Sequence, residues 1–158
     1  MGRSLDVRHW GDGSSSVNPC WGAGSYDCRV RDAALVAVYE AAVFDVEFPD
    51  GLRSFDASGQ LSGGRVSEAF GGVTAWNPGW ERLSPTENEA ANVRLAEAID
   101  ALGWRRLPAA GHDRGGTYSE PSFAVFGATE GELVDLAREF RQAAIFWWDG
   151  ERCRVVWC

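Results

Sequence analysis

Several polar side chains in the second half of this 158-residue chain are of the types that bind small molecules or catalyse their reactions. Glu120 is the candidate general acid or base, and burial would have to raise its pKa for this role near neutral pH. Side-chain amides both donate and accept hydrogen bonds, as the recognition of a base or a sugar requires. The candidate ligand-binding amides are Asn77, Asn88, Asn92 and Gln142.

Three further candidates lie close to Glu120 along the chain. His112 and Tyr118 stand in a Gly-rich stretch, and Ser122 follows Glu120 by two residues. A serine nucleophile needs a base beside it, and the sequence fixes no histidine near Ser122. We therefore expect these three side chains to bind a ligand rather than to attack it, although a histidine in a Gly-rich loop, such as His112, is more often a solvated loop residue.

The sequence excludes several reaction classes. It contains no GxSxG, HExxH, dinucleotide-binding or phosphate-loop motif. Its 15 basic residues are all arginine, which excludes lysine chemistry. The cysteines lack the spacing of a zinc knuckle, so we expect reduced thiols and neither a metal nor a cofactor. They are Cys20, Cys28, Cys153 and Cys158.

Charge and hydropathy limit the partners. The formal net charge of −8 argues against binding to a phosphate backbone, so nucleic acid is an unlikely partner in our interpretation. No apolar run approaches the roughly 20 residues that span a bilayer, and residues 1–10 lack the apolar core of a signal peptide. We therefore expect no membrane association and a cytoplasmic location.

The first half of the chain predicts few elements. Residues 1–29 are rich in Gly and Ser without a sustained period, which predicts a flexible or loosely docked N-terminal arm. We expect residues 30–158 to form a single α+β domain. Within it, the pattern predicts a helix over 32–41 and a hairpin of two strands over 44–48 and 52–55, whereas residues 58–71 give no assignment.

The second half has clearer signals. Two capping boxes, Ser84 with Glu87 and Thr129 with Glu132, each open a predicted helix, the first of which runs to Leu102. Strands are predicted over 73–76, 104–107 and 122–126, with a Gly-rich loop over 108–119 and a final hairpin of 144–148 and 153–157. The order β-α-β-β-α-β is that of a ferredoxin-like sandwich, with both helices on one face of the sheet and the first-half hairpin as an addition.

This topology brings the candidate residues to one edge of the sheet. Helices in such a fold run antiparallel to the strands that flank them. The ends of strands and helices that then meet carry Asn77, Asn88, Glu120, Ser122 and Gln142, together with the loop of His112, Asp113 and Tyr118. Loops at one edge of a rigid scaffold are a usual place for function.

Two of these residues also point inward. Asn88 and Asn92 share the helical spacing of Leu95, Ile99 and Leu102, so both amides should face the apolar core. A buried amide must find hydrogen-bond partners. The pair is therefore either the floor of a polar pocket or a purely structural network, and the sequence leaves both interpretations open.

Four segments resemble a known family. They are 74–78 (TAWNP), Ser84 with 87–88 (EN), 120–123 (EPSF) and 140–145 (FRQAAI). Their order and spacing are similar to a bacterial family of unknown function, domain of unknown function 3293, over about residues 33–157. Arg141 stands where that family tends to have Gly, and Trp76 where it often has Tyr. The resemblance implies kinship and no reaction.

Two functions of different classes remain open. The first is a small polar-ligand site for a nucleotide-like or metabolite-like molecule, with Glu120 as the only plausible acid or base. The second is a protein-interaction or inhibitor module that uses an acidic, Trp-rich surface, including Trp147 and Trp148. Exposure of these tryptophans would favour the second function and their burial would count against it.

Overall fold

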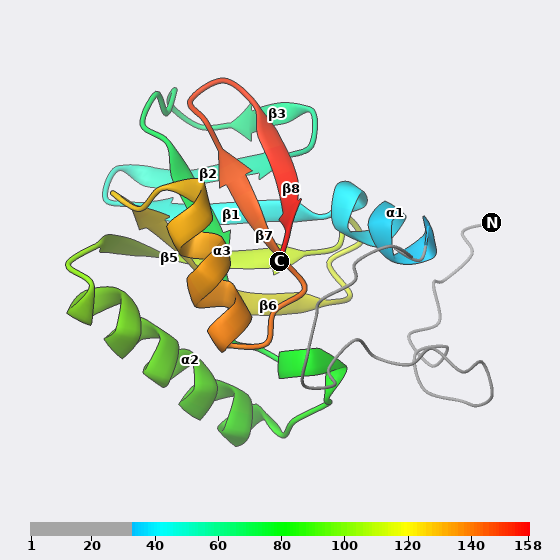
Figure 1. The fold of residues 1–158 in the computed structure, drawn as a ribbon. Helices are drawn as coiled ribbons and strands as arrows, with labels where there is room; N and C mark the ends of the chain where they lie inside the picture. The colour runs from blue at the N-terminus through cyan, green and yellow to red at the C-terminus, as the bar shows by residue number, and fades with distance from the viewer. Residues whose placement is uncertain (1–32) are drawn as a thin grey trace, which may run out of the picture. The chain divides into compact units, whose positions relative to one another are not determined.

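The computed structural model describes residues 33–158, in which three helices accompany one eight-stranded sheet (Figure 1). The chain is therefore a mixed α+β structure, as predicted, and the predicted arm of residues 1–29 lies outside the described residues. The helices are α1 (Ala33–Ala41), α2 (Pro85–Ala101) and α3 (Glu130–Glu139), with a 3-10 turn η2 (Pro78–Trp80). The strands are β1 (Val43–Phe48), β2 (Gly51–Asp56), β3 (Gly59–Ser62), β4 (Phe70–Val73), β5 (Arg105–His112), β6 (Ser119–Phe126), β7 (Ala144–Trp148) and β8 (Cys153–Trp157).

All neighbouring strands of the sheet are antiparallel. Their order is β3-β2-β1-β5-β6-β4-β7-β8, so the first-half hairpin joins the sheet through the pairing of β1 with β5. β2 also contacts β8 near the opposite end of this order, which makes the sheet nearly closed. No helix in residues 33–158 is long and apolar enough to cross a lipid bilayer.

Both predicted capping boxes form. The Ser84 hydroxyl accepts from the backbone N–H of Glu87, whose carboxylate accepts from the N–H of Ser84, and Thr129 and Glu132 repeat this exchange at α3. Each box satisfies two backbone donors that a helix start leaves without partners. The local sequence thus sets where both helices begin.

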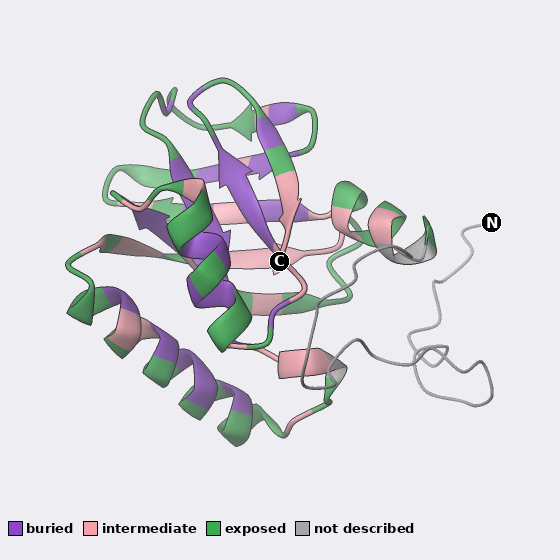
Figure 2. Ribbon diagram, viewed as in Figure 1, coloured by how far each residue is buried: buried purple, intermediate pink, exposed green. Residues whose placement is uncertain are grey.

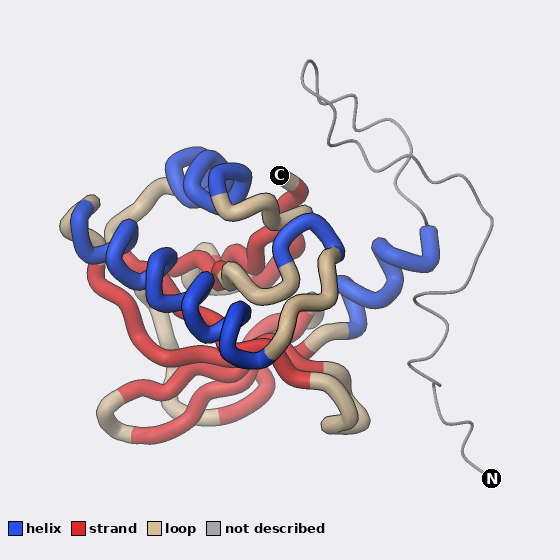
Figure 3. The backbone as a smooth tube through the Cα atoms, turned by 90° about the horizontal axis from the view of Figure 1, so that it is seen from below, coloured by secondary structure: helices blue, strands red, loops and turns tan. Residues whose placement is uncertain are grey.

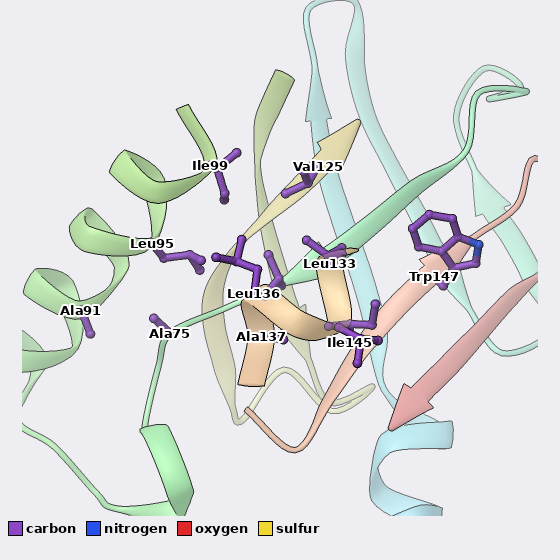
Figure 4. Packing of buried hydrophobic residues seen from close by; sticks show 12 residues of the cluster. Ala75, Ala91, Leu95, Ile99, Val125, Leu133, Leu136, Ala137, Ile145 and Trp147 are labelled. Carbon is purple, nitrogen blue, oxygen red and sulfur yellow. The ribbon is translucent and has the colours of Figure 1, made fainter. Parts of the chain in front are cut away.

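Helices α2 and α3 lie on one side of the sheet and share a hydrophobic cluster with it (Figures 3 and 4). The labelled side chains of α2 and α3 point toward one another and toward the strands (Figure 4). Burial follows one stripe of α2, which faces the sheet (Figure 2). Leu102 is an exception to the prediction, because it caps the end of α2 and is 53% exposed.

The other face of the sheet encloses a second, more aromatic cluster. Phe44, Phe55, Phe70, Phe126 and Trp148 are all buried in it. Phe70 lies at the centre of these rings, with centroid separations of 5.1 Å to Phe55 and 5.3 Å to Phe126. The curled sheet thus has a packed interior rather than an open channel.

β4 separates the two clusters and was placed too late by sequence reasoning. It covers Phe70–Val73 instead of the predicted 73–76. A Cβ at Gly71 would lie 2.0 Å from a methyl carbon of Leu133, and one at Gly72 would lie 2.4 Å from the Phe44 ring. The two glycines are therefore required by close packing on opposite faces of the strand, and this requirement hid the strand from sequence reasoning.

The predicted strand over 104–107 and the Gly-rich loop over 108–119 are also wrong in extent. β5 and β6 form a long hairpin whose turn covers only residues 113–118. Pro108 lies just beyond Ala109, the last residue of β5 that pairs with β1. A proline, which has no N–H, can be accommodated where the ladder on that side has ended.

Candidate functional site

Asn88 fixes the backbone of Asn77 at the turn between β4 and α2. The Asn77 N–H donates to Oδ1 of Asn88 at 2.7 Å, and Nδ2 of Asn88 donates to Oδ1 of Asn77 at 2.9 Å. Asn77 has φ 47° and ψ 56°, a left-handed conformation that asparagine tolerates better than most residues. Asn88 is 2% exposed, so a buried side chain holds the turn through these two hydrogen bonds.

Asn92 connects the same turn to β6. Its Oδ1 accepts from the backbone N–H of Ala75 at 2.8 Å, and its Nδ2 donates to the carbonyl of Pro121 at 2.8 Å. Asn92 is 8% exposed. The contacts of Asn88 and Asn92 thus match the structural network rather than a pocket floor.

Asn77, Tyr118 and Glu120 form a hydrogen-bonded chain. Nδ2 of Asn77 donates to the Tyr118 hydroxyl at 3.3 Å, and that hydroxyl donates to Oε1 of Glu120. We call these three residues the Glu120 cluster. Tyr118 is 45% exposed and Glu120 is half-buried, so the cluster lies at the edge of the curled sheet and is accessible to solvent.

The surroundings of Glu120 favour its neutral form. Burial raises the pKa of Glu120, and the hydrogen bonds from Tyr118 and Asn77 only partly oppose this rise. Burial and the neighbouring Glu120 charge likewise raise the pKa of Tyr118. An acid or base that works near neutral pH requires a raised carboxyl pKa, and the surroundings of Glu120 raise its pKa.

Ser122 and Gln142 support this edge from behind. The buried Ser122 hydroxyl donates to the Glu120 carbonyl at 3.0 Å. Nε2 of Gln142, a residue 8% exposed, donates to the carbonyls of Trp76 and Phe140, both at 3.3 Å. Gln142 thereby ties the end of α3 to the turn that carries Asn77.

His112 lies on the opposite face of the sheet from Glu120. It pairs with Ser119 across the hairpin, and successive residues of a strand point to opposite faces. Its Nε2 lies 3.0 Å from Oδ2 of Asp45, and its Nδ1 lies 2.9 Å from the Asp113 carbonyl. Sequence reasoning grouped His112 with Tyr118 because it expected one loop, whereas the strand continues to His112.

Asp113 explains how Tyr118 is held. Its carboxylate accepts from the Tyr118 N–H at 2.7 Å and from the Thr117 hydroxyl at 2.8 Å. These bonds stabilise the turn of residues 113–118, after which β6 begins. Asp113 thus positions a member of the Glu120 cluster from the turn.

Sequence reasoning missed two neighbours of the cluster. Tyr39 of α1 is close enough to Glu120 and Tyr118 for their charges to raise its pKa, although burial is the larger cause. The exposed Arg82 is close enough to Tyr118 to lower its pKa. No local pattern marks either residue, because α1 and the turn before α2 reach the cluster only through the tertiary fold.

The described part of the chain shows no alternative metal centre. Within residues 33–158, no three His, Cys, Asp or Glu side chains are grouped closely enough to hold a metal ion. Cys153 is buried and is a free thiol, and Cys158 is half-buried. Burial raises the pKa of the Cys153 thiol, which opposes formation of a reactive thiolate.

The comparisons with known proteins found one similarity, to a family model. No curated protein and no solved structure matches the chain. One family model, described as "Protein of unknown function (DUF3293)", matches residues 73–145, a shorter span than the resemblance suggested. The matched span contains Asn77, Asn88, Tyr118, Glu120 and Gln142. The part of the chain that carries the candidate site is therefore similar to the DUF3293 family.

Proposed function

We propose that this protein binds a small polar ligand at the Glu120 cluster. The observation that carries the proposal is a half-buried carboxyl group whose pKa is raised and whose hydrogen-bond donors are the neutral Tyr118 and Asn77 side chains. Perturbed titratable groups of this kind concentrate at functional sites. The exposure of Tyr118 gives a ligand access to the pair.

The remaining predicted residues have positioning roles in this proposal. Asn88 and Asn92 hold the turn, Ser122 holds the Glu120 backbone, and Gln142 supports the turn from α3. Ligand sites depend on such supporting residues, because a small displacement of the contacting groups weakens binding. His112 is left out of the proposed site because it lies across the sheet.

A catalytic role for Glu120 is the second candidate function. A carboxyl with a raised pKa retains its proton closer to neutrality and could act as a general acid. The protein-interaction alternative gains nothing from Trp147 and Trp148, which are only 8% and 3% exposed. An acidic docking surface elsewhere remains a prediction.

We also propose that residues 70–148 form a ferredoxin-like unit within the larger sheet. Their element order is β4-α2-β5-β6-α3-β7, and their strands lie in the order β5-β6-β4-β7. Both helices pack on one face of this unit, which supports the assignment.

Ligand screening of the full chain tests the proposed function. Thermal-shift measurements against nucleosides, nucleotides, sugars, amino acids and amines should give a saturable hit, because binding to the folded state alone raises stability by about 2.7 kcal/mol at a hundred times Kd. We expect Glu120→Gln to weaken the hit at least about ten-fold and Tyr118→Phe to weaken it less. Glu97→Gln, which removes an equal charge from the exposed side of α2, is the matched control and should leave it unchanged.

Two results would contradict the proposal. One is a set of hits whose affinities survive both Glu120→Gln and Tyr118→Phe, which would place binding elsewhere. The other is no hit in a screen with folded, thermally cooperative protein. Both variants retain side-chain size, so circular dichroism should confirm that loss of binding is not loss of folding.

A further inference from the structure

We infer that the ligand of the Glu120 cluster is a small organic cation, of the guanidinium or quaternary ammonium class. This inference rests on the proposed function and names its ligand chemistry. Its basis is the number of hydrogen bonds that the cluster has already made, together with the charges and rings around it.

The Tyr118 hydroxyl and one N–H of the Asn77 amide are already engaged as donors. The Tyr118 hydroxyl donates to Glu120 and accepts from Nδ2 of Asn77. Oδ1 of Asn77 accepts from Nδ2 of Asn88 at 2.9 Å and from the N–H of Leu83 at 3.2 Å. A carboxylate has about four lone-pair directions, and it is acceptor-only when ionised. Most of the capacity left at the cluster is therefore acceptor capacity on Glu120, which favours a ligand that donates.

The carboxyl also lacks a balancing charge among the described residues that set its pKa. Its partners there are Tyr118 and Asn77, both neutral. Arg82 acts on the pKa of Tyr118 and stands exposed at the rim. A desolvated carboxylate is costly without a positive partner, so a bound cation would remove the penalty that burial imposes.

One tyrosine contacts this carboxyl, and a second lies within range of its charge. Tyr118 is bonded to it, and Tyr39 is near enough to be influenced by its charge. The Tyr39 ring meets the Trp157 ring edge-on, with centroids 5.1 Å apart and an interplanar angle of 60°. Aromatic faces attract organic cations, and a carboxylate among rings is a suitable setting for one. The chain's net charge of −8 adds a long-range attraction for cations.

The inference fixes the direction of the pH dependence. A cation binds the ionised form of Glu120, so affinity should increase as pH rises through the raised pKa of that carboxyl, with release of a proton on binding. The neighbouring Tyr118 and Tyr39 have pKa values raised by burial and stay neutral in this range. The Arg82 guanidinium lies near Tyr118, and Cys158 lies near Tyr39.

Calorimetric titration of the full chain with charged and uncharged isosteres tests the inference. The probes are methylguanidinium against methylurea, and choline against 3,3-dimethylbutan-1-ol, at constant ionic strength and at pH 5 and pH 8. We expect one cation to bind saturably at pH 8, at least about ten-fold more tightly than its neutral isostere. Glu120→Gln should remove this preference, whereas Glu97→Gln should preserve it.

The outcomes separate this inference from the proposed function. If a neutral or anionic ligand from the screen requires Glu120 while neither cation exceeds its isostere, the ligand class is wrong and the site stands. If no ligand of any charge depends on Glu120 or Tyr118, both proposals fail. A cation preference that persists in Glu120→Gln overturns the inference, because it would come from the general negative field.

Discussion

Asp56 and Glu120 are two carboxyl groups set back from the solvent in different parts of the sheet, and their pKa values are displaced in opposite directions. Asp56, at the end of β2, is 2% exposed. It accepts from the Ser58 N–H at 2.8 Å, from the Ser58 hydroxyl at 2.5 Å, and from the Arg114 guanidinium. Burial alone would raise the pKa of Asp56, but the hydrogen bonds from Ser58 and then Arg114 lower it below its ordinary value.

Burial raises the pKa of such an acid unless its hydrogen-bond partners outweigh the cost of burial. Asp56 is more deeply buried than Glu120 and is nevertheless held ionised, because one of its donors is a cation. Glu120 has neutral donors, and burial determines the direction of its pKa shift. Asp56 is therefore a structural tie between the β2–β3 turn and the β5–β6 turn, whereas Glu120 retains unused binding capacity.

The largest expected effect is the contrast between Asp56→Asn and Glu120→Gln. Asp56→Asn should destabilise the fold by about 2 kcal/mol at pH 7, because a buried acceptor for the Ser58 and Arg114 donors is lost. Glu120→Gln should be at least as stable as the original protein at pH 8, since it removes a carboxylate that burial penalises. Chemical denaturation of both variants measures the difference.

The pH dependence of the two acids should also have opposite signs. The lowered pKa of Asp56 contributes stability that is present above the ordinary value of 3.8 and is lost as pH falls through the folded-state pKa. The raised pKa of Glu120 contributes stability that is present below 4.5 and is lost as pH rises through the folded-state pKa. Denaturation curves from pH 3 to pH 8 that show the same sign for both variants would break the comparison.

A smaller effect is expected when the cation is removed from Asp56. Arg114→Gln should raise the pKa of Asp56 and make its surroundings more like those of Glu120. Because the Arg114 side chain is 60% exposed, the loss of stability should be no more than about 1 kcal/mol. NMR titration of the Asp56 carboxyl carbon measures the shift. Arg94→Gln, on the exposed side of α2, should leave this pKa where it is.

The smallest expected effect concerns His112. The Asp113 carbonyl and the Asp45 carboxylate raise the pKa of His112 above 6.5, against the effect of burial. Its contribution to stability is therefore present below pH 6.5 and is lost as pH rises through the folded-state pKa. His112→Gln should cost less than about 1 kcal/mol at pH 5.5 and less again at pH 8.5. Equal costs at the two pH values would mean that the imidazole charge contributes nothing.

Sequence reasoning succeeded where the signals were local. The capping boxes of Ser84 and Thr129 located both long helices, and the Asp149–Gly150 turn located the β7–β8 hairpin. It also brought Asn77, Asn88 and Glu120 to one edge, because strand and helix directions follow from element order. These features depend on hydrogen bonds between residues close in the chain or on the sequence of elements.

It failed where distant side chains determine the outcome. The glycines of β4 gave no strand signal in the sequence, although the close packing of Leu133 and Phe44 leaves no room for a Cβ at these positions. The inward spacing of Asn88 and Asn92 was correct, but their partners at Asn77 and Pro121 could not be inferred from spacing. The face on which His112 lies depended on how far β5 extends, which its pairing with β1 and β6 determines.

The adjacent glycines of β4 have a consequence for how the molecule unfolds. At Gly71 and Gly72 only the backbone of β4 separates the two hydrophobic clusters, because Leu133 packs against one face of the strand and the Phe44 ring against the other. A change in the packing of one cluster would push β4 against the side chains of the other cluster, so the two clusters cannot loosen independently. The β4 amides should therefore exchange their hydrogens only through complete unfolding, at the same rate on both sides of the strand.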